Sequence, residues 1–441
     1  MTTNGLAPPL WRQLQATAAM LQAIQHGQSG TAALDAVPAP LRAGVQALGF
    51  AVLRSLGRAQ ALRKLLATRA PPAPADALLC TALALLWQPE GALYDTFTLV
   101  NQTVEAAKKS VAMKPQASFI NACLRRFLRE REALVAQTGH DQMARYNHPA
   151  WWIAQLQVDW PERWQAILAA NDRHAPMTLR VNTRCLSRDA YQVKLQEAGL
   201  SASPVAQSGL ALADAMAVQQ LPGFAQGWVS VQDAAAQVAA PLLLSGLDQA
   251  GPLRVLDACA APGGKTAHLL ESANVSVTAL DIDPVRGERI HQNLQRLGLS
   301  AQVLAFDAAD VSAWWDGVPF DAVLLDAPCS ASGIVRRHPD IRWLRRQSDI
   351  GQLVAIQARL LAALWGVVKP GGRLLYCTCS VFKAEGSSQV EAFLARNIQA
   401  KLLASPGYLL PGAAAHTNSA MDNPLGDHDG FYYALLEKSA A

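Results

Sequence analysis

Residues 253–270 read LRVLDACAAPGGKTAHLL, and they decide the fold of the domain around them. The apolar residues at the start of this stretch predict a buried strand. Small residues and glycines follow and predict a tight turn, after which Lys265–Leu270 predicts the first turns of a helix. A strand, a glycine-rich turn and a helix N-terminus leave backbone N–H groups free, with few side chains in front of them. The stretch therefore predicts a binding site for an adenosine-type cofactor.

Two other nucleotide-binding motifs do not fit this stretch. The dinucleotide fingerprint requires the glycine spacing G-x-G-x-x-G, which residues 257–264 lack. The phosphate-binding P-loop requires a glycine five residues before Gly-Lys-Thr, and Cys259 occupies that position. Neither motif is therefore predicted here.

The composition of the whole chain limits the class of protein. The chain has 441 residues, of which 51% are hydrophobic, so we expect two or three domains with buried cores. The longest uncharged apolar runs, such as Ala77–Trp87, are too short to span a bilayer. Residues 1–15 lack the charged-then-apolar pattern of a signal peptide, so we expect a cytoplasmic protein. The seven cysteines include no C-x-x-C pair, and we expect free thiols and no bound metal.

Residues 1–140 predict an all-helical domain, because apolar residues recur at three- and four-residue spacing. The predicted helices are Ala16–Ile24, Leu41–Leu56, Arg58–Ala67, Ala77–Leu86, Tyr94–Val111 and Ala117–Glu132, with breaks at Gly27–Gly30, Ala70–Ala75 and Gly91. This domain holds about 14 Lys and Arg against about 7 Asp and Glu. The excess indicates either a polyanion partner or a solvated helix surface, and charge alone does not separate the two.

Residues 141–235 predict a small α/β connector domain. Trp151, Trp152, Trp160 and Trp164 lie close together near its start, and packing at a domain junction is favoured over stacking on bases. Short β-like pieces follow, such as Thr178–Val181.

Residues 236–441 predict a doubly wound parallel sheet, because predicted strands alternate with helices. The strands are Arg254–Ala258, Val275–Asp281, Ala301–Phe306, Phe320–Leu325 and Arg373–Cys377, and the helices include Pro284–Leu297 and Ser348–Val367. A last hairpin is expected near residues 430–435. Ligands of such sheets bind beyond the carboxyl ends of the strands.

Acidic residues follow three of the predicted strands at that edge: Asp281, Asp307 and Asp326. Asp281 lies about 20 residues after the glycine turn, where a carboxylate accepts hydrogen bonds from ribose hydroxyls, and Asp283 is the alternative. Asp307 is placed to reach an adenine edge. Any one of these acids is compatible with a helix cap, but three in register indicate a site.

Two cysteines also follow strand ends, Cys329 within DAPCS (residues 326–330) and Cys379 within TCS (residues 378–380). A thiol suits covalent catalysis, because its thiolate is nucleophilic near neutral pH and is also a good leaving group. Residue chemistry alone does not decide which of the two cysteines attacks. Cys377 is expected to lie in the core.

These segments resemble the RNA cytosine-5 methyltransferases. The family motif D-x-C-A-A-P-G-G-K-T matches this chain at Asp257, Cys259, Ala260, Ala261, Pro262, Gly263, Gly264, Lys265 and Thr266. The resemblance implies a class I, Rossmann-like domain that binds S-adenosylmethionine through Cys259, Ala260, Ala261, Pro262, Gly263, Gly264, Lys265, Asp281, Asp307 and Asp326. It also implies that Cys379 is the nucleophile, that Cys329 assists product release and that Asp326 pairs with the cytosine edge.

Residues 100–108 and 119–126 resemble helices of the NusB family of RNA-binding helical bundles. A NusB-like start, a connector and a methyltransferase sheet together resemble the RsmB (Fmu/Sun) family, which implies formation of 5-methylcytosine in 16S ribosomal RNA. Two alternatives stay open: a tRNA cytosine-5 methyltransferase, and a NusB-like RNA-binding or antitermination factor whose methyltransferase domain is inert. The chain departs from the family at Lys383–Gly386, which reads KAEG where the family has Pro-Glu-Glu-Asn.

Basic side chains complete the predicted RNA site. Five arginines between the two cysteines are expected to contact phosphates, with a solvated loop as the alternative: Arg336, Arg337, Arg342, Arg345 and Arg346. Arg125, Arg126, Arg129 and Arg131 are equally compatible with phosphate contact and with a solvated helix face. Arg180 and Asn182 are expected to help to shape an RNA groove.

Overall fold

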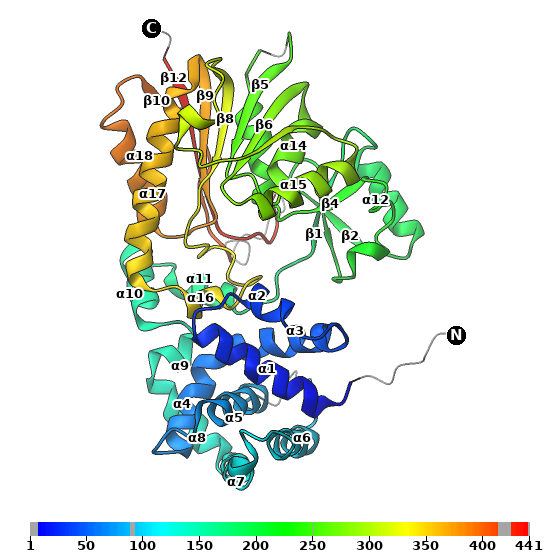
Figure 1. The fold of residues 1–441 in the computed structure, drawn as a ribbon, viewed down its shortest axis with the longest axis vertical. Coiled ribbons are helices and arrows are strands. Elements are labelled where there is room, and N and C mark those ends of the chain that lie inside the picture. Colours follow the sequence, from blue (N-terminus) through cyan, green and yellow to red (C-terminus); the bar gives the residue numbers. More distant parts are fainter. Residues whose placement is uncertain (1–7, 89–92, 249, 413–424, 440–441) are drawn as a thin grey trace. The chain divides into compact units, whose positions relative to one another are not determined.

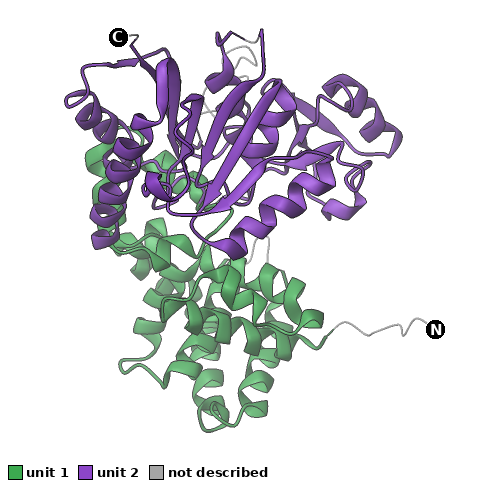
Figure 2. Ribbon diagram, turned by 45° about the horizontal axis from the view of Figure 1, so that its top comes forward, with its two compact units in different colours: residues 1–172, 335–346 green, residues 173–334, 347–441 purple. Residues whose placement is uncertain are grey.

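The structure is a computed structural model that describes residues 8–88, 93–248, 250–412 and 425–439. The chain forms two compact units (Figures 1 and 2). The helical unit comprises Met1–Asp172 and Val335–Arg346, and the sheet unit comprises Arg173–Ile334 and Gln347–Ala441. None of the described helices is both long and apolar enough to cross a bilayer. The division into three domains with boundaries after residues 140 and 235 stays a prediction.

The helical unit confirms the all-helical prediction for the first part of the chain. Its helices are α1 (Leu10–Gln25), α2 (Gly30–Asp35), α3 (Ala39–Leu53), α4 (Leu56–Leu66), α5 (Ala73–Leu86), α6 (Thr96–Lys109), α7 (Ala117–Arg129), α8 (Arg131–Gln137), α9 (Gln142–Tyr146), α10 (Ala150–Asp159), α11 (Trp164–Asn171) and α16 (Ile341–Leu344). Helix α5 is buried along almost its whole length, as its uniformly apolar sequence requires. It begins inside the proline-rich break, because Pro74 lies in its first turn, where a missing N–H costs no hydrogen bond. The break expected at Gly91 lies outside the described residues.

The tryptophans near residue 150 are packing residues. Trp152 is fully buried, and its ring lies 5.8 Å from that of His148 and 5.3 Å from that of Trp151. The ring of Trp164 meets that of Tyr146 edge-on at 4.9 Å. These contacts agree with the packing interpretation of the cluster.

The arginine-rich segment between the two cysteines corrects a prediction. Residues 335–346 belong to the helical unit, where Arg336 and Arg342 are 1% and 0% exposed. The Arg342 guanidinium donates to the Asp172 carboxylate at 2.5 Å and to the backbone oxygen of Asn171 at 2.8 Å. Because these guanidinium groups are enclosed in protein, phosphate contact is wrong for Arg336 and Arg342. The sequence shows charge but not burial, which is why the run predicted phosphate contact.

Asp340 connects residues 335–346 to the start of α2 within the helical unit. Its carboxylate accepts a hydrogen bond from the Gly30 N–H at 2.8 Å, at the start of α2. A Cβ at Gly30 would lie 2.8 Å from the Asp340 carboxyl carbon, so only glycine lets the two segments approach this closely. The indole N–H of Trp343 donates to the backbone oxygen of Leu53 at 3.1 Å.

The sheet unit begins with a small antiparallel sheet in the order β2-β3-β1-β4. Its elements are β1 (Thr178–Val181), α12 (Arg188–Glu197), β2 (Ala202–Val205), β3 (Gly209–Leu212) and β4 (Val229–Val231). Arg180 on β1 is fully buried and pairs with Glu271, its Nε and Nη2 lying 2.8 and 2.9 Å from the two carboxylate oxygens. Asn182 donates to the backbone oxygen of Gly227 at 3.0 Å. Both side chains are buried, so neither is placed to contact RNA directly, and a role in shaping an RNA groove stays a prediction.

The large sheet has the order β10-β12-β9-β8-β5-β6-β7, with β11 paired to β12. The strands are β5 (Leu253–Ala258), β6 (Val275–Asp281), β7 (Gln302–Ala305), β8 (Phe320–Asp326), β9 (Val368–Thr378), β10 (Ala400–Leu402), β11 (Gly407–Leu409) and β12 (Phe431–Lys438). Strands β5 to β9 are parallel, as predicted. Strand β12 is antiparallel to β9 and lies between β9 and β10, so the sheet is mixed. Strand β12 also pairs antiparallel with β11, so only the second strand of the expected hairpin lies near residues 430–435. Its continuous apolar run fits a buried strand of either direction, which is why sequence did not decide.

Helices cover both faces of this sheet (Figure 1). Helices α13 (Ala239–Leu244), α14 (Gly264–Ser272) and α15 (Pro284–Leu297) share one apolar core with side chains such as Val255 and Leu324. Helices α17 (Gln347–Gly366) and α18 (Ser387–Leu394) share the other core with Leu256 and Val323. Neighbouring residues of β5 and β8 thus point to opposite faces, as in a doubly wound fold. The chain order reverses between β5 and β8, and ligands of such sheets bind at this switch point.

Candidate active site

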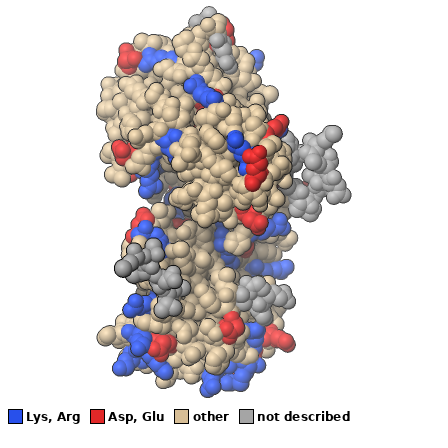
Figure 3. Space-filling model, turned by 90° about the vertical axis from the view of Figure 1, so that its right-hand side faces the viewer, with Lys and Arg blue, Asp and Glu red and all other residues tan. Residues whose placement is uncertain are grey.

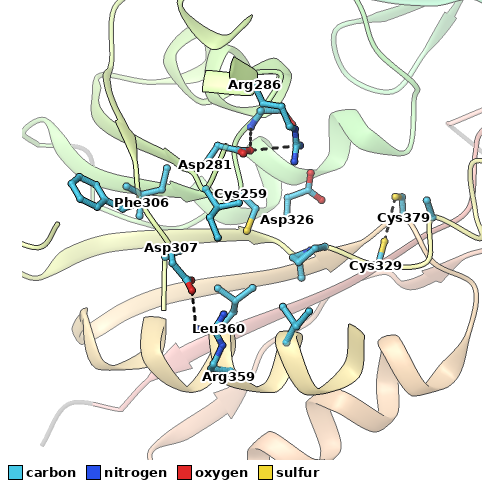
Figure 4. Close-up of a pocket in the computed structure, with 18 residues that line it drawn as sticks. Cys259, Asp281, Arg286, Phe306, Asp307, Asp326, Cys329, Arg359, Leu360 and Cys379 are labelled. Atoms are coloured by element: carbon cyan, nitrogen blue, oxygen red, sulfur yellow. Dashed lines mark hydrogen bonds and ion pairs between the residues drawn. The ribbon is translucent and has the colours of Figure 1, made fainter. Parts of the chain in front are cut away.

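A cavity of about 430 Å³ lies at the carboxyl ends of the parallel strands (Figure 4). Predicted site residues that line it are Cys259, Ala261, Asp281, Asp307, Asp326, Cys329 and Cys379. They come from the ends of five strands, β5 to β9, or from the turns just after them. The structure therefore brings together in one place the acids and thiols that sequence reasoning assigned to one sheet edge.

The glycine-rich turn closes one side of the cavity. Cys259 has a φ of 62° and Gly263 a φ of 93°, so the backbone turns sharply between β5 and α14. A Cβ at Gly263 would lie 3.1 Å from the Cα of Ile290 on α15, which leaves little room for a side chain. Pro262 is exposed and Ala260 packs into the core, so these two serve the shape of the turn.

Asp281 is the acid that faces the turn. Its carboxylate accepts a hydrogen bond from the Ala261 N–H at 3.1 Å and lies 3.5 Å from the Arg286 guanidinium. The alternative acid, Asp283, caps α15 by accepting from the Val285 N–H at 2.8 Å and lies outside the cavity lining. The geometry therefore favours Asp281 over Asp283 as a ligand group.

Asp307 follows β7 on the opposite wall. Its carboxylate accepts from the Ala309 N–H and from the Arg359 guanidinium, both at 2.9 Å. Burial would raise the pKa of Asp307, but these two interactions outweigh it and hold the pKa below its usual value. Asp307 is therefore charged at neutral pH.

Several cavity residues escaped the sequence analysis. Phe306 and Ile282 adjoin the acids in the chain and expose 40% and 67% of their surface. Ile356, Arg359 and Leu360 come from α17. The position of Ile282 and Phe306 directly beside the strand-end acids was a signal that the sequence contains. Nothing in the helical pattern distinguished the α17 residues from others of that helix.

Lys265 connects the turn to Asp326. Its ammonium group lies 2.6 Å from the Asp326 carboxylate and sits over the ring of Phe431 at 5.3 Å. Burial alone would lower the pKa of Lys265, but the Asp326 carboxylate raises it above the ordinary value. Gly264 forms the first residue of α14 beside it. The Cys377 thiol approaches the other Asp326 oxygen at 3.5 Å from within the core, where burial raises its pKa.

The thiols of Cys329 and Cys379 face each other, with 3.5 Å between their sulfur atoms (Figure 4). Cys329 is 8% exposed, and Cys379 is the more open of the two. The contact with Cys379, and after it burial, raises the pKa of Cys329 well above that of a free thiol. Cys329 therefore carries its proton at neutral pH, which suits a group that donates protons better than one that attacks.

Asp257, at the carboxyl end of β5, lies beneath the turn and outside the cavity. It is fully buried and accepts a hydrogen bond from the Thr266 hydroxyl at 2.6 Å. Burial raises the pKa of Asp257 to about 7.

This shift predicts a pH dependence of stability. A folded-state pKa of about 7 against about 4 in the unfolded chain means that only the folded state holds this proton between those values. The free energy of unfolding therefore falls as pH rises from about 4 to about 7, by on the order of 4 kcal/mol. Asp257→Asn has no titrating group at this position, so its free energy of unfolding lacks this pH-dependent contribution. Melting temperatures of the two proteins at pH 4.5 and 7.5 test this: the advantage of the wild type over the variant shrinks at the higher pH, and a pH-independent difference contradicts it.

The described residues hold no group of three or more His, Cys, Asp or Glu side chains arranged around a metal ion. A family model for "16S rRNA methyltransferase RsmB/F" matches residues 246–437, and one for the ferredoxin-like domain of the same proteins matches residues 148–219. The ribosomal RNA small subunit methyltransferase B of Vibrio cholerae is 43% identical over 435 residues, covering 96% of each chain. This chain belongs to the RsmB/F methyltransferase family.

Other comparisons agree with this membership. The methyltransferase B of Pseudomonas putida is 44% identical and covers 97% of this chain and 98% of its own. The crystal structure of PH0851 shares the fold with a TM-score of 0.74 at 24% identity, covering 96% of this chain and 99% of that one. A methyltransferase homologue from Pyrococcus horikoshii has a TM-score of 0.55 at 27% identity and covers 68% of this chain and 98% of its own. The Rossmann-like fold predicted from the sequence is thus the family fold, with a mixed rather than a purely parallel sheet.

Proposed function

We propose that this RsmB/F family member transfers a methyl group from S-adenosylmethionine to C5 of a cytosine in 16S ribosomal RNA. The observation that carries the proposal is the pair of thiols, 3.5 Å apart, in the same cavity as the glycine-rich turn. A cofactor site and a nucleophile that share one crevice are what a methyl transfer to a pyrimidine ring needs. Relatives over nearly the full length bear the name ribosomal RNA small subunit methyltransferase B, which supports 16S RNA as the substrate.

The cavity residues fit S-adenosylmethionine. Asp281 and Asp307 both line the cavity, and we expect Asp281 to accept from ribose hydroxyls and Asp307 to accept from an adenine amino group. The exposed apolar side chains of Ile282 and Phe306 offer surfaces for the faces of the adenine ring. When bound, S-adenosylmethionine supplies an electrophilic methyl group on its sulfonium.

The chain's own residues then act on the cytosine. Cys379, as thiolate, adds to C6, and the electron pair of the C5–C6 double bond becomes available at C5. Asp326, held by Lys265, pairs with the cytosine edge and favours this addition. After C5 is methylated and loses its proton, the bond between C6 and Cys379 breaks and the C5–C6 double bond returns. Cys329, protonated beside Cys379, assists this release.

The helical unit supplies candidate contacts to the RNA backbone. Figure 3 shows Lys and Arg side chains at its lower end, where α6, α7 and α8 lie in Figure 1. Arg125, Arg126 and Arg129 on α7 and Lys108 and Lys109 on α6 are exposed. Exposed cations of this kind bind phosphates without reading sequence. We also infer a cytoplasmic location, where the substrate RNA is made and thiols stay reduced.

Bisulfite sequencing of ribosomal RNA from cells with and without this protein tests the proposal. We expect one protected cytosine of 16S RNA to become convertible when the protein is absent and to be protected again when the gene is restored. Loss of a protected cytosine in tRNA instead would favour the tRNA alternative. An unchanged pattern, together with no heat of binding on titration with S-adenosylmethionine, would favour an inert RNA-binding protein.

A further inference from the structure

Glu385 is a buried carboxylate that the proposed reaction does not use. It is fully buried at the end of a short 3₁₀ turn, Lys383–Glu385, just before α18. One carboxylate oxygen accepts from the Ser330 N–H at 2.7 Å. The other accepts from the hydroxyls of Ser330 at 2.5 Å and Ser380 at 2.6 Å. Hydrogen bonds to a buried charge are short and strong, so these serines are firmly held.

The two serines are the chain neighbours of the two reactive thiols. Ser330 directly follows Cys329, and Ser380 directly follows Cys379. One carboxylate therefore ties together the loop after β8 and the loop after β9. The backbone adds a second tie, because the Gly333 N–H donates to the Cys379 backbone oxygen at 2.9 Å.

Neighbouring side chains hold the carboxylate itself. The Gln357 amide on α17 donates to Glu385 at 3.2 Å and to the backbone oxygen of Pro328 at 3.0 Å. Cys329 is thus fixed on both sides, through Pro328 and through Ser330. The Tyr376 hydroxyl donates to the backbone oxygen of Glu385 at 2.8 Å and anchors it to β9.

We propose that Glu385 is a positioning residue that sets the separation of the Cys329 and Cys379 thiols. The inference rests on the proposed function, in which both thiols serve one cytosine in turn. Since a carboxylate only accepts hydrogen bonds, both serine hydroxyls must point their protons toward it, which defines one arrangement of the two loops. In Glu385→Gln the side chain keeps its shape, but its NH₂ group is a hydrogen-bond donor and would face the serine hydroxyls, which also donate. A displacement of about 1 Å at a reacting group costs up to about 10²-fold in rate.

Disulfide trapping tests the separation without RNA or cofactor. Sulfurs 3.5 Å apart need to move only about 1.5 Å to form a disulfide bond. The azo reagent diamide takes up the two thiol hydrogens and becomes a hydrazine while the S–S bond forms. We expect the Cys329–Cys379 peptide pair, quantified by mass spectrometry, to form at least about 10-fold more slowly in Glu385→Gln. Glu391→Gln, an exposed glutamate on α18, is the matched control and keeps the wild-type rate.

Kinetics of RNA methylation provide the second readout. We expect Glu385→Gln to lower kcat by about 10- to 100-fold while the KM for RNA and the affinity for S-adenosylmethionine stay within about twofold. Ser380→Ala removes the hydrogen bond from the Ser380 hydroxyl to Glu385, and we expect it to lower both the trapping rate and kcat by less than Glu385→Gln does. This variant tests the inference if Glu385→Gln does not fold.

If Glu385→Gln and Ser380→Ala both kept the wild-type rate of disulfide trapping and the wild-type kcat, the inference would be overturned. A slowed trapping rate in a protein that makes no 5-methylcytosine would leave the positioning role standing and refute the proposed function. A wild type that methylates RNA normally, together with a Glu385→Gln variant whose trapping rate and kcat are unchanged, would refute the positioning role and leave the proposed function standing.

Discussion

Cys379→Ala is expected to abolish methylation, lowering turnover by a factor of at least about 10⁴, while S-adenosylmethionine still binds. The reason is chemical: without addition at C6, C5 of cytosine has no electron pair to offer the methyl group. We expect that Cys329 does not substitute in this variant, because its burial still raises the pKa of its thiol when the Cys379 contact is gone. Transfer of radiolabelled methyl to RNA measures turnover, and calorimetric titration measures cofactor affinity.

The chain offers a matched control for this variant. Cys185 is an exposed cysteine of the sheet unit outside the cavity, so Cys185→Ala removes a thiol without touching the site. We expect it to methylate RNA at the wild-type rate. Residual methylation by Cys379→Ala above about 0.01% of wild type, the level set by a loss of about 10⁴-fold, would contradict the assignment of the nucleophile.

Cys329→Ala is expected to trap the protein on its RNA. In this variant Cys379 still attacks, but the release of the methylated product loses its assisting thiol. Turnover should fall by about 10²-fold or more, in the range of a lost proton-transfer group. A protein–RNA adduct should accumulate as a slower band on a denaturing gel, dependent on S-adenosylmethionine.

A double variant tests whether Cys379 is the residue that forms the bond to RNA. Cys329→Ala combined with Cys379→Ala should give no adduct, because the bond to RNA is made by Cys379. The reverse pattern, an adduct in Cys379→Ala and none in Cys329→Ala, would exchange the two roles. The 3.5 Å between the sulfurs permits either order geometrically, and the burial and raised pKa of Cys329 favour Cys379 as the nucleophile, so this experiment tests the assignment of the roles.

Local signals in the sequence predicted several elements to the residue. Strand β6 and helix α15 span Val275–Asp281 and Pro284–Leu297, as expected from a buried apolar run and from proline and glycine at the helix ends. The Gly298 left-handed cap confirms where that helix stops. Such features depend on neighbours in the chain, which is why sequence suffices for them.

The convergence of the site was also predictable, because parallel strands place their carboxyl ends at one edge. Asp281, Asp307, Asp326, Cys329 and Cys379 all line the cavity. Their catalytic and binding roles stay predictions, of which the variants above test those of Cys329 and Cys379.

The sequence by itself determined the helical first part, the parallel direction of β5 to β9 and the edge at which acids and thiols meet, because each follows from local pattern and chain direction. Only the tertiary structure decided the antiparallel direction of β12, the burial of Arg336 and Arg342, and the clamp of Glu385 on Ser330 and Ser380. Apart from the hydrogen bond between Ser380 and Glu385, which are five residues apart, these features arise from contacts between segments tens to hundreds of residues apart. A single sequence records the charge and size of such partners but not which of them meet.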